Sequence, residues 1–543
     1  MATPRSALAA AQVASTTTWQ TDLKALFDRA KDRFPDVVWE LSAEDNHVGD
    51  EVWGHKGIVA FPVGIQVMAD YLMVLNLHCG IAAIVYARAP PSFLSQYFDV
   101  GPNGGGARTF SCSPDMGGNV NGTQSSFSLA LQEDRISPSR ASRAYTPSNA
   151  PQPNPILRLT TTISPSLFSN QLEYLYTGSG IGDAFDFLFT DAYDEEKLSG
   201  DVEANRIDKL RKDLTFMWRS RLYSDVHISL TGPFSPDSDE ATAVFSSHRF
   251  ILASRSSYFH SRFSSSGSAP VGSFGPSNPV TITLASPPFT PASLHFTLGH
   301  IYSGTLNFSN RTFDLTTAFQ IYKCAVEICL EELRKEVEAR IVEEMAHGLF
   351  HAYLTLDQYN KVTGGRWGVG GCKCKQCTRR APRILEFATA EDVKNNVLER
   401  GARRALVGLF GEGWVTPEFA ALPSKAREKA LKGVYMRATI QNIIPLLFAA
   451  NTALQRLETP GSNDQPWSDA TREIITQARK KIDDVLVSQC EEVFEQEEWL
   501  SILERDGVQF NDADKVRWVM DSIRRGLNDT NAGLLYQVSV FIP

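Results

Sequence analysis

Between Asp225 and Ala346 the spacing of apolar residues changes in a fixed order, and this order restricts the fold more than any other feature of the sequence. The segments DVHISL, TAVFSS and PVTITL alternate as half-buried strands do. HRFILASRSSYFHSRF, which lies between the second and third strands, has the spacing of a helix, and two further helical segments follow PVTITL. The pattern predicts a small sheet covered by helices.

Aromatic residues in this unit indicate which helix faces are buried. Tyr258, Phe259 and Phe263 recur at helical spacing and are predicted to pack in the core. Tyr302 and Gly304, in the sequence YSG, mark the end of a helix, because glycine takes a positive φ there at no steric cost.

Five segments of this unit resemble, in order and spacing, the BTB/POZ family of protein-interaction domains: SDVHISL, FSSHRFILASRSSYF, VTITL, HIYSGTLNF and LTTAFQIYKCAVEICLEEL. The resemblance implies a BTB/POZ domain over 221–346. It also implies that Asp225, His248 and Arg249 lie near the surface through which two such domains pair, with a charged pair that adds specificity more than stability. An alternative is that His248 only caps the helix and packs.

A weaker copy of the same segments precedes this unit. PDVVWEL corresponds to SDVHISL, GHKGIV with ARAPPSFLSQYF corresponds to the helix motif, and ILRLTTTISPSLFSNQLEYLYTG corresponds to the last strand and helix. We therefore predict an N-terminal tail over 1–30 and a first BTB/POZ domain over 31–190. By the same resemblance, Asp36, His55 and Lys56 lie on its pairing surface.

Two unusual stretches interrupt the first copy, an apolar insert at 59–86 and a segment rich in Gly, Ser, Asn and Pro at 99–156. Hydropathy favours a transmembrane helix for the insert, but the two halves of one small domain would then lie on opposite sides of a bilayer. A surface loop of this composition would expose a sticky apolar patch. We interpret the insert as translated intron, and 99–156 as a disordered linker that buries too little apolar surface to order.

The rest of the chain is predicted to be helical. An acidic connector and a helix, RIDKLRKDLTFMWRSRL, occupy 191–220, and a helix end with a cysteine-rich basic loop occupies 347–383. Apolar residues at helical spacing then continue over 384–543, which resembles the BACK-like region that follows some BTB/POZ domains. The expected fold class is α+β, with two BTB/POZ domains followed by an all-helical domain, an arrangement that resembles tandem fungal proteins.

Three closely spaced cysteines in GVGGCKCKQCTRRAPR form a C-x-C-x2-C array, Cys372, Cys374 and Cys377. Thiolates so close together suit zinc, which takes four nitrogen or sulfur ligands in a tetrahedron. His347 and His351 are four residues apart on the predicted preceding helix, and either completes a Cys3His site. We assign His351 as the fourth ligand. The alternative is a basic loop with three free thiols and no cofactor.

Charge and motifs exclude several classes of function. The net charge of −9 argues against nucleic-acid binding, because a protein that neutralises phosphates carries an excess of Lys and Arg. The start of the sequence lacks the apolar stretch of a secretory signal, so we expect cytoplasmic or nuclear thiols rather than disulfides. No phosphate-binding loop, nucleophile elbow or H-E-x-x-H motif is present, which argues against an enzyme.

The resemblance implies a protein-interaction scaffold that forms homo- or hetero-oligomers through BTB/POZ domains, with no membrane association. Such domains commonly serve as substrate adaptors of cullin-3 RING ubiquitin ligases, and we expect this role here, with a client held by the C-terminal helices. The chain departs from many cullin-binding members in one respect, since SRFSSSGSAPVGSF contains no Glu after the helix motif. The alternative is a nuclear scaffold or transcriptional regulator whose basic cysteine loop contacts DNA or chromatin.

Overall fold

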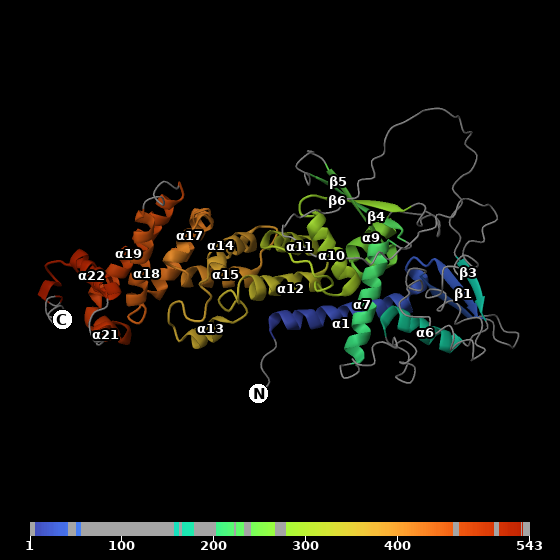
Figure 1. Ribbon diagram of the computed structural model, residues 1–543, viewed down its shortest axis with the longest axis horizontal. Helices are drawn as coiled ribbons and strands as arrows, with labels where there is room; N and C mark the ends of the chain where they lie inside the picture. Colours follow the sequence, from blue (N-terminus) through green and yellow to red (C-terminus); the bar gives the residue numbers. More distant parts are fainter. Residues whose placement is uncertain are drawn as a thin grey trace, which may run out of the picture.

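The computed structural model describes residues 6–41, 50–55, 157–161, 165–178, 202–221, 224–232, 241–265, 279–459, 466–503, 510–533 and 535. Over these residues the molecule is elongated, with two small sheets at one end and a succession of helices toward the other (Figure 1). The apolar insert at 59–86 and the linker at 99–156 lie outside the described residues, so their interpretation stays a prediction.

The second sheet contains the three strands predicted after Asp225. Strand β4 (Val226–Gly232) pairs antiparallel with β5 (Ala241–Ser247) and parallel with β6 (Val280–Ala285). Val226, Ile228 and Leu230 of β4 are buried, whereas the residues between them are only half-buried. The period of two in the sequence therefore corresponds to one buried face of the strand.

The first sheet has the same topology. Strand β1 (Val37–Leu41) pairs antiparallel with β2 (Asp50–Gly54) and parallel with β3 (Leu157–Thr161). Val38 and Trp39 in the middle of β1 are buried. The two sheets therefore share one strand order, β2-β1-β3 in the first and β5-β4-β6 in the second, with the same pairing directions.

The helix motif of the second unit forms two helices, α8 (Arg249–Arg255) and α9 (Ser257–Ser265). Ser256 separates them with an extended backbone, φ −135° and ψ 122°. Its hydroxyl donates a hydrogen bond of 2.7 Å to the carbonyl oxygen of Ile328. The prediction of one continuous helix was wrong because this tertiary hydrogen bond holds the break without disturbing the apolar spacing on either side.

The predicted core aromatics and helix end are found in this unit. Phe259 and Phe263 are buried, and the partly buried Tyr258 packs against the same core. Helix α10 (Pro291–Ser303) ends at Gly304, whose φ of 69° is left-handed. Both sequence predictions are confirmed.

The expected N-terminal tail instead contains α1 (Ala7–Asp28), a helix of 22 residues that lies along α12 (Figure 1). The fully buried Trp19 donates its indole N–H to the carbonyl oxygen of Tyr302 at 3.1 Å. The prediction of a tail was wrong because the buried stripe of this helix is narrow and lies among Ala, Ser and Thr. Its members are Leu8, Ser15, Trp19, Leu23 and Leu26.

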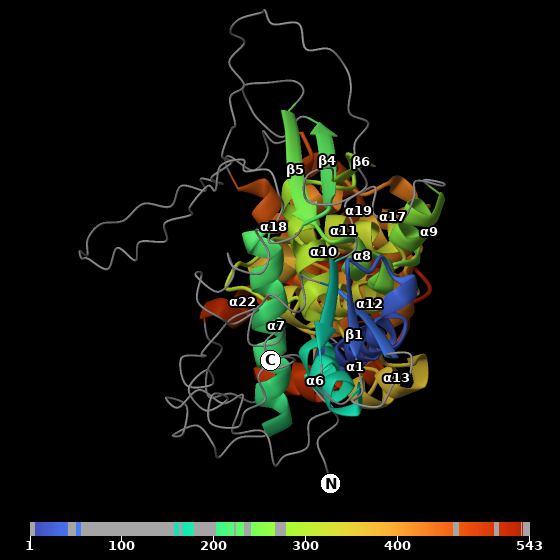
Figure 2. The ribbon, with the colours of Figure 1, turned by 90° about the vertical axis from the view of Figure 1, so that its right-hand side faces the viewer.

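Helix α7 (Val202–Ser220) precedes β4 and runs past both α10 and α6 (Pro165–Thr177) (Figure 2). Arg211 joins α7 to the rest of the core. Its Nε donates to the carbonyl oxygen of Ser303 at 2.9 Å, and its Nη2 donates to the hydroxyl of Thr16 at 2.6 Å. This one side chain therefore contacts both the end of α10 and the middle of α1.

The second unit continues without a gap in the core into the helical region. Helices α11 (Leu315–Glu327) and α12 (Glu331–Arg340) lead into a π-helical turn, Ile341–Met345. The helices that follow are α13 (Leu356–Thr363), α14 (Lys375–Thr389), α15 (Asn396–Gly408), α16 (Pro417–Ala420), α17 (Ser424–Arg437), α18 (Ile443–Glu458), α19 (Ser468–Ser488), α20 (Cys490–Phe494), α21 (Glu497–Leu503) and α22 (Phe510–Gly526). Among the described residues, no helix combines the length and apolar character that spanning a bilayer requires.

We expect Trp19→Ala to lower the free energy of unfolding by about 3 to 5 kcal/mol, because it empties a fully buried site and removes the donor to Tyr302. Urea unfolding followed by circular dichroism measures this loss. Val13 is 50% exposed on the same helix, so Val13→Ala serves as the control and should change stability by less than about 0.5 kcal/mol. Equal, small effects of both substitutions would show that α1 is not docked.

Candidate pairing face and candidate metal centre

Asp225 and Arg249 form a charged pair where β4 begins and α8 starts. The Nε of Arg249 donates to Oδ2 of Asp225 at 2.7 Å, and the backbone N–H of Arg249 donates to Oδ1 at 2.8 Å. Each side chain is 15% exposed. Asp225 therefore caps the N-terminus of α8 and neutralises the guanidinium in the same contact.

His248 is fully buried and binds Tyr302 of α10. Its backbone N–H donates to the Tyr302 hydroxyl at 3.0 Å, and its ring Nδ1 lies 2.8 Å from the same oxygen. His248 is the N-cap residue of α8 and is buried, as the capping interpretation expects, although its ring makes no capping hydrogen bond. The ring instead ties the start of α8 to α10.

The N-terminal unit, which comprises α1, β1, β2, β3 and α6, repeats this contact with His55 and Tyr176. The backbone N–H of His55 donates to the Tyr176 hydroxyl at 2.9 Å, and Nδ1 lies 2.7 Å from it. Nε2 of His55 lies 2.7 Å from the carbonyl oxygen of Arg33, so Nε2 carries the proton and Nδ1 accepts from the hydroxyl. Burial lowers the pKa of His55 to about 4, which keeps this ring neutral.

Asp36 and Lys56 are the other two residues predicted on the pairing surface of the N-terminal unit, and the structure describes only Asp36. Asp36 precedes β1 as Asp225 precedes β4, and its backbone N–H donates to the carbonyl oxygen of Gly54 at 3.2 Å. Burial, with the Asp36 carboxylate nearby, raises the pKa of Tyr176 well above its usual value, so its hydroxyl stays a donor. Lys56 lies outside the described residues.

His55 and Arg249 lie where the N-terminal unit meets the second unit. The ring of Phe250 on α8 stacks on His55, with centroids 4.3 Å apart. The guanidinium of Arg249 lies 5.1 Å from the ring centroid of Phe34, and Phe34 also contacts Phe263 edge to face. The face expected to pair with another domain is therefore in contact with the N-terminal unit of the same chain.

The helix that precedes each sheet reaches a glycine that ends a helix of the other unit. Trp19 of α1 lies against Gly304 at the end of α10, and Leu210 of α7 lies against Gly178 after α6. Both glycines have positive φ, 69° and 72°. A Cβ on Gly304 would lie 2.6 Å from Trp19, so the close approach of α1 requires glycine there. Each helix also packs within its own unit, α1 on α6 and α7 on α10, so the two helices make equivalent contacts across the junction rather than changing places.

A second candidate site lies at the start of α14, where three cysteines converge on His347. Nδ1 of His347 lies 3.2, 3.5 and 3.4 Å from Sγ of Cys372, Cys374 and Cys377, and the four atoms lie within 4.8 Å of one another. A zinc tetrahedron with ordinary bond lengths has nitrogen-to-sulfur edges of about 3.5 Å. This Cys3His cluster, as we call these four residues, has the ligand types and spacing of a closed metal site.

The sequence assignment of His351 to this cluster is corrected to His347. Every residue from His347 to His351 has a positive φ, between 22° and 84°, so this stretch is a left-handed turn rather than part of a helix. The shared helical face on which the two histidines were placed does not form. His351 instead lies beside Tyr359, with ring centroids 6.3 Å apart.

The backbone of α14 helps to prepare the thiols for a metal. Cys374 occupies the N-cap of α14, and its Sγ accepts the backbone N–H of Cys377 at 3.4 Å. Burial opposes ionisation of Cys374, but this hydrogen bond and those from the neighbouring thiols lower its pKa to about 6. Burial and the same neighbours raise the pKa of Cys377. A bound cation would stabilise all three thiolates.

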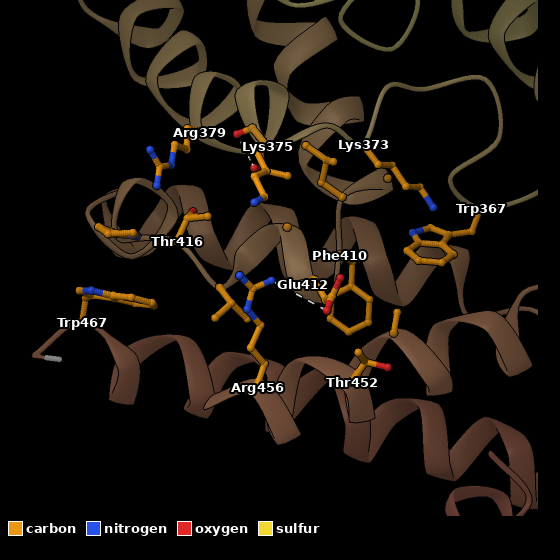
Figure 3. A pocket seen from close by; sticks show the side chains of 17 residues that line it. Trp367, Lys373, Lys375, Arg379, Phe410, Glu412, Thr416, Thr452, Arg456 and Trp467 are labelled. Carbon is orange, nitrogen blue, oxygen red and sulfur yellow. Dashed lines mark hydrogen bonds and ion pairs between the residues drawn. The ribbon is translucent and has the colours of Figure 1, made fainter. Parts of the chain in front are cut away.

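The basic residues of the cysteine loop divide into two groups. Arg380 donates to the carbonyl oxygen of Met345 at 2.5 Å, and Arg383 donates to the hydroxyl of Thr316 at 2.8 Å. Lys373, Lys375 and Arg379 instead line a pocket on the far side of the loop (Figure 3). Sequence reasoning missed this pocket, because its opposite wall comes from helices more than thirty residues further along the chain.

Sequence reasoning also missed the tyrosines that bind His55 and His248. The signal was present, because LYTG and IYSG occupy equivalent places in the two copies.

Comparison with known families assigns the second unit. A family model of the BTB/POZ domain matches residues 217–344, which run from the end of α7 through the π-helical turn after α12. No curated protein matches the chain at a significant level.

The pH dependence of stability tests the His55 contact. The pKa of His55 is about 4 in the folded chain and about 6.5 when unfolded, so its stabilising contribution is complete above pH 6.5 and is lost as the pH falls toward 4. We expect the wild type to lose up to about 3 kcal/mol more over this interval than His55→Gln does. Urea unfolding at several pH values measures the slopes.

His260→Gln, on the half-buried surface of α9, is the control and should keep the wild-type slope. A His55→Gln profile parallel to the wild type would contradict the buried, neutral His55.

Proposed function

We propose that the chain, a protein-interaction scaffold whose residues 217–344 form a BTB/POZ domain, serves as a substrate adaptor of a cullin-3 RING ubiquitin ligase. In this proposal the BTB/POZ domain recruits the ligase, and the C-terminal helices hold the client. The chain carries out no chemistry of its own and works in the cytoplasm, the nucleus or both.

The observation that carries this proposal is the firm junction between the BTB/POZ domain and the helices after it. Phe319 of α11 stacks on Phe387 of α14, with ring centroids 4.0 Å apart. Asn395, just before α15, donates to the Tyr322 hydroxyl at 2.9 Å and to the Glu338 carboxylate at 2.6 Å. An adaptor has to hold ligase and client at a fixed separation, and a junction of this kind provides it.

We also propose that the N-terminal unit is itself a BTB-like domain. It would pair with the BTB/POZ domain of residues 217–344 in the same chain. Three features support this proposal: the shared strand order of the two sheets, the equivalent contacts of His55 with Tyr176 and of His248 with Tyr302, and the equivalent approach of α1 to Gly304 and of α7 to Gly178. The face that such domains use for oligomerisation is then occupied in cis. Self-association through that face would occur between the two halves of one chain.

The alternative, a nuclear regulator whose cysteine loop contacts DNA, receives less support. Arg380 and Arg383 donate their hydrogen bonds to Met345 and Thr316 within the protein. The net charge of −9 also opposes binding to phosphates.

We propose zinc as the occupant of the Cys3His cluster. Three thiols and one imidazole nitrogen are the ligands of structural zinc sites, and the His347 to sulfur distances agree with its tetrahedron. His347 lies shortly after the BTB/POZ match, and Cys374 is the N-cap of α14, so the metal would hold together the two ends of the intervening segment that carries α13. Structural zinc sites of this kind contribute about 10 kcal/mol to folding.

Binding of cullin-3 is tested with the purified full chain and the N-terminal domain of cullin-3. We expect a complex that contains one copy of each protein by light scattering, because pairing in cis leaves the free chain monomeric. Val326 is 46% exposed on α11, beside the helical extension where related adaptors contact cullin. Val326→Asp should weaken the complex about tenfold, since it places a charge in an apolar contact.

The matched control is Val244→Asp on β5, where Val244 is 52% exposed, and it should bind as the wild type does. Failure of the wild type to bind cullin-3 would refute the adaptor role. A dimer of free chains that persists at low micromolar concentration would refute pairing in cis.

Metal analysis of the purified chain tests the zinc proposal. We expect about one zinc per chain in the wild type, and its loss in His347→Ala and in Cys374→Ser, because each removes one of four ligands. His351→Ala is the matched control and should retain the metal, since its ring lies outside the cluster. Zinc retained in His347→Ala, or lost only in His351→Ala, would show that His347 is not the fourth ligand and would favour His351 in its place.

A further inference from the structure

Cations and aromatic rings gather in one pocket beside the cysteine loop (Figure 3). The cavity of about 740 Å³ lies between the start of α14, the turn after α15, and helix α18. This volume falls within the range of sites that bind small ligands or a few side chains of a peptide. Neither the BTB/POZ domain nor the Cys3His cluster accounts for it.

The charge of the lining is strongly positive. Lys373, Lys375, Arg379 and Arg456 line the pocket, and Glu412 is the one carboxylate among the lining residues. The chain as a whole carries a net charge of −9, so four cations around one cavity stand out against the rest of the protein. An electrostatic field of this sign attracts anionic groups into the pocket.

The internal ion pairs of these cations are weak. Arg456 lies 3.9 Å from Glu412, and Arg379 lies 4.0 Å from Glu418, with both arginines exposed. Pairs at this distance and exposure contribute little to stability. Lys375 has no carboxylate within ion-pair distance among the described residues, and its Nζ points into the pocket from above Arg456 (Figure 3). Lys375, Arg379 and Arg456 are therefore available to a ligand.

The walls of the pocket are aromatic and well supported. Lys373 lies over the ring of Trp367, with Nζ 4.5 Å from the centroid, and the Trp367 indole N–H donates to the carbonyl oxygen of Val407 at 2.8 Å. Phe410 and Trp467 line other parts of the cavity. Apolar side chains fit against these rings, whereas carboxylates fit the cations above them.

We propose that this pocket binds an acidic peptide segment in which Asp or Glu residues flank an apolar side chain. Lys375, Arg379 and Arg456 would contact the carboxylates, and the half-buried Trp467 would contact the apolar side chain. Nucleic acid fits less well, because one face of Trp367 is already covered by Lys373 and the acidic chain repels an extended phosphate backbone. This inference deepens the adaptor proposal, since the pocket would be where the client is held, but peptide binding itself does not require a ligase.

Fluorescence anisotropy with the full chain tests the proposal. The probe is a fluorescein-labelled peptide with the sequence Glu-Glu-Asp-Leu-Phe-Glu-Glu, and the same peptide with Gln and Asn in place of its acids is the comparison. We expect the acidic peptide to bind at least about tenfold more tightly, with an affinity that falls as salt increases. The double variant Lys375→Glu with Arg456→Glu should abolish this preference.

The matched control is Lys480→Glu with Lys481→Glu, which reverses two exposed charges on α19 outside the pocket. It should bind the acidic peptide as the wild type does. Equal loss in both double variants would show a non-specific charge effect and overturn the proposal. Tighter binding of a twelve-nucleotide thymidine strand than of the acidic peptide would assign the pocket to nucleic acid instead.

Two further measurements separate this proposal from the others. Circular dichroism and zinc content verify that the pocket variant is folded, and Lys375→Gln with Arg456→Gln replaces it if charge reversal unfolds the chain. The pocket variant should bind cullin-3 as the wild type does, because its substitutions lie outside residues 217–344. If the wild type binds the acidic peptide but not cullin-3, the pocket proposal stands and the adaptor role is refuted. If it binds cullin-3 but not the peptide, the adaptor role stands and the pocket proposal is refuted.

Discussion

The close packing of Trp19 against Gly304 is the contact on which the arrangement of the two units depends. The indole fills the space that a Cβ would take, and its N–H satisfies the carbonyl oxygen of Tyr302 at the end of α10. Tyr302 in turn binds His248, which begins α8. One buried ring thus connects the first helix of the chain to the strand-helix junction of the BTB/POZ domain.

Equivalent contacts, made by different side chains, occur in the N-terminal unit. Gly178 accepts Leu210 where Gly304 accepts Trp19, and Tyr176 binds His55 where Tyr302 binds His248. Arg211 of α7 then joins this helix to α1 through the hydroxyl of Thr16. The buried hydroxyls of Tyr176 and Tyr302 and the rings of His55 and His248 are held in matched hydrogen bonds, which favours one fixed geometry over loose association.

The sequence predicted those features that depend on local spacing and missed those that depend on backbone handedness or distant partners. Strands β4, β5 and β6, the buried Phe259 and the left-handed Gly304 all follow from short-range patterns. His351 was assigned to the Cys3His cluster in place of His347 because five successive residues take positive φ. Among residue types, only glycine signals a positive φ in a sequence.

Helix α1 was missed for a different reason. Its stripe contains only a few large apolar residues, and its burial depends on a partner surface almost three hundred residues away, at Tyr302 and Gly304. The pocket beside the cysteine loop was missed in the same way, since Arg456 and Trp467 approach Lys375 only after α18 and α19 have folded back on α14 and α15. Local periodicity contains no information of this kind.

The sequence CKCK, residues 372–375, contributes to both the Cys3His cluster and the pocket. Cys372 and Cys374 face His347, whereas Lys373 and Lys375 line the cavity on the other side of the loop. Cys374 has an extended backbone just before α14, so a metal held by the cysteines would also restrict the directions of the neighbouring lysines. With the proposed metal bound, the Cys3His cluster would stabilise the loop and help to determine where two cations of the pocket lie.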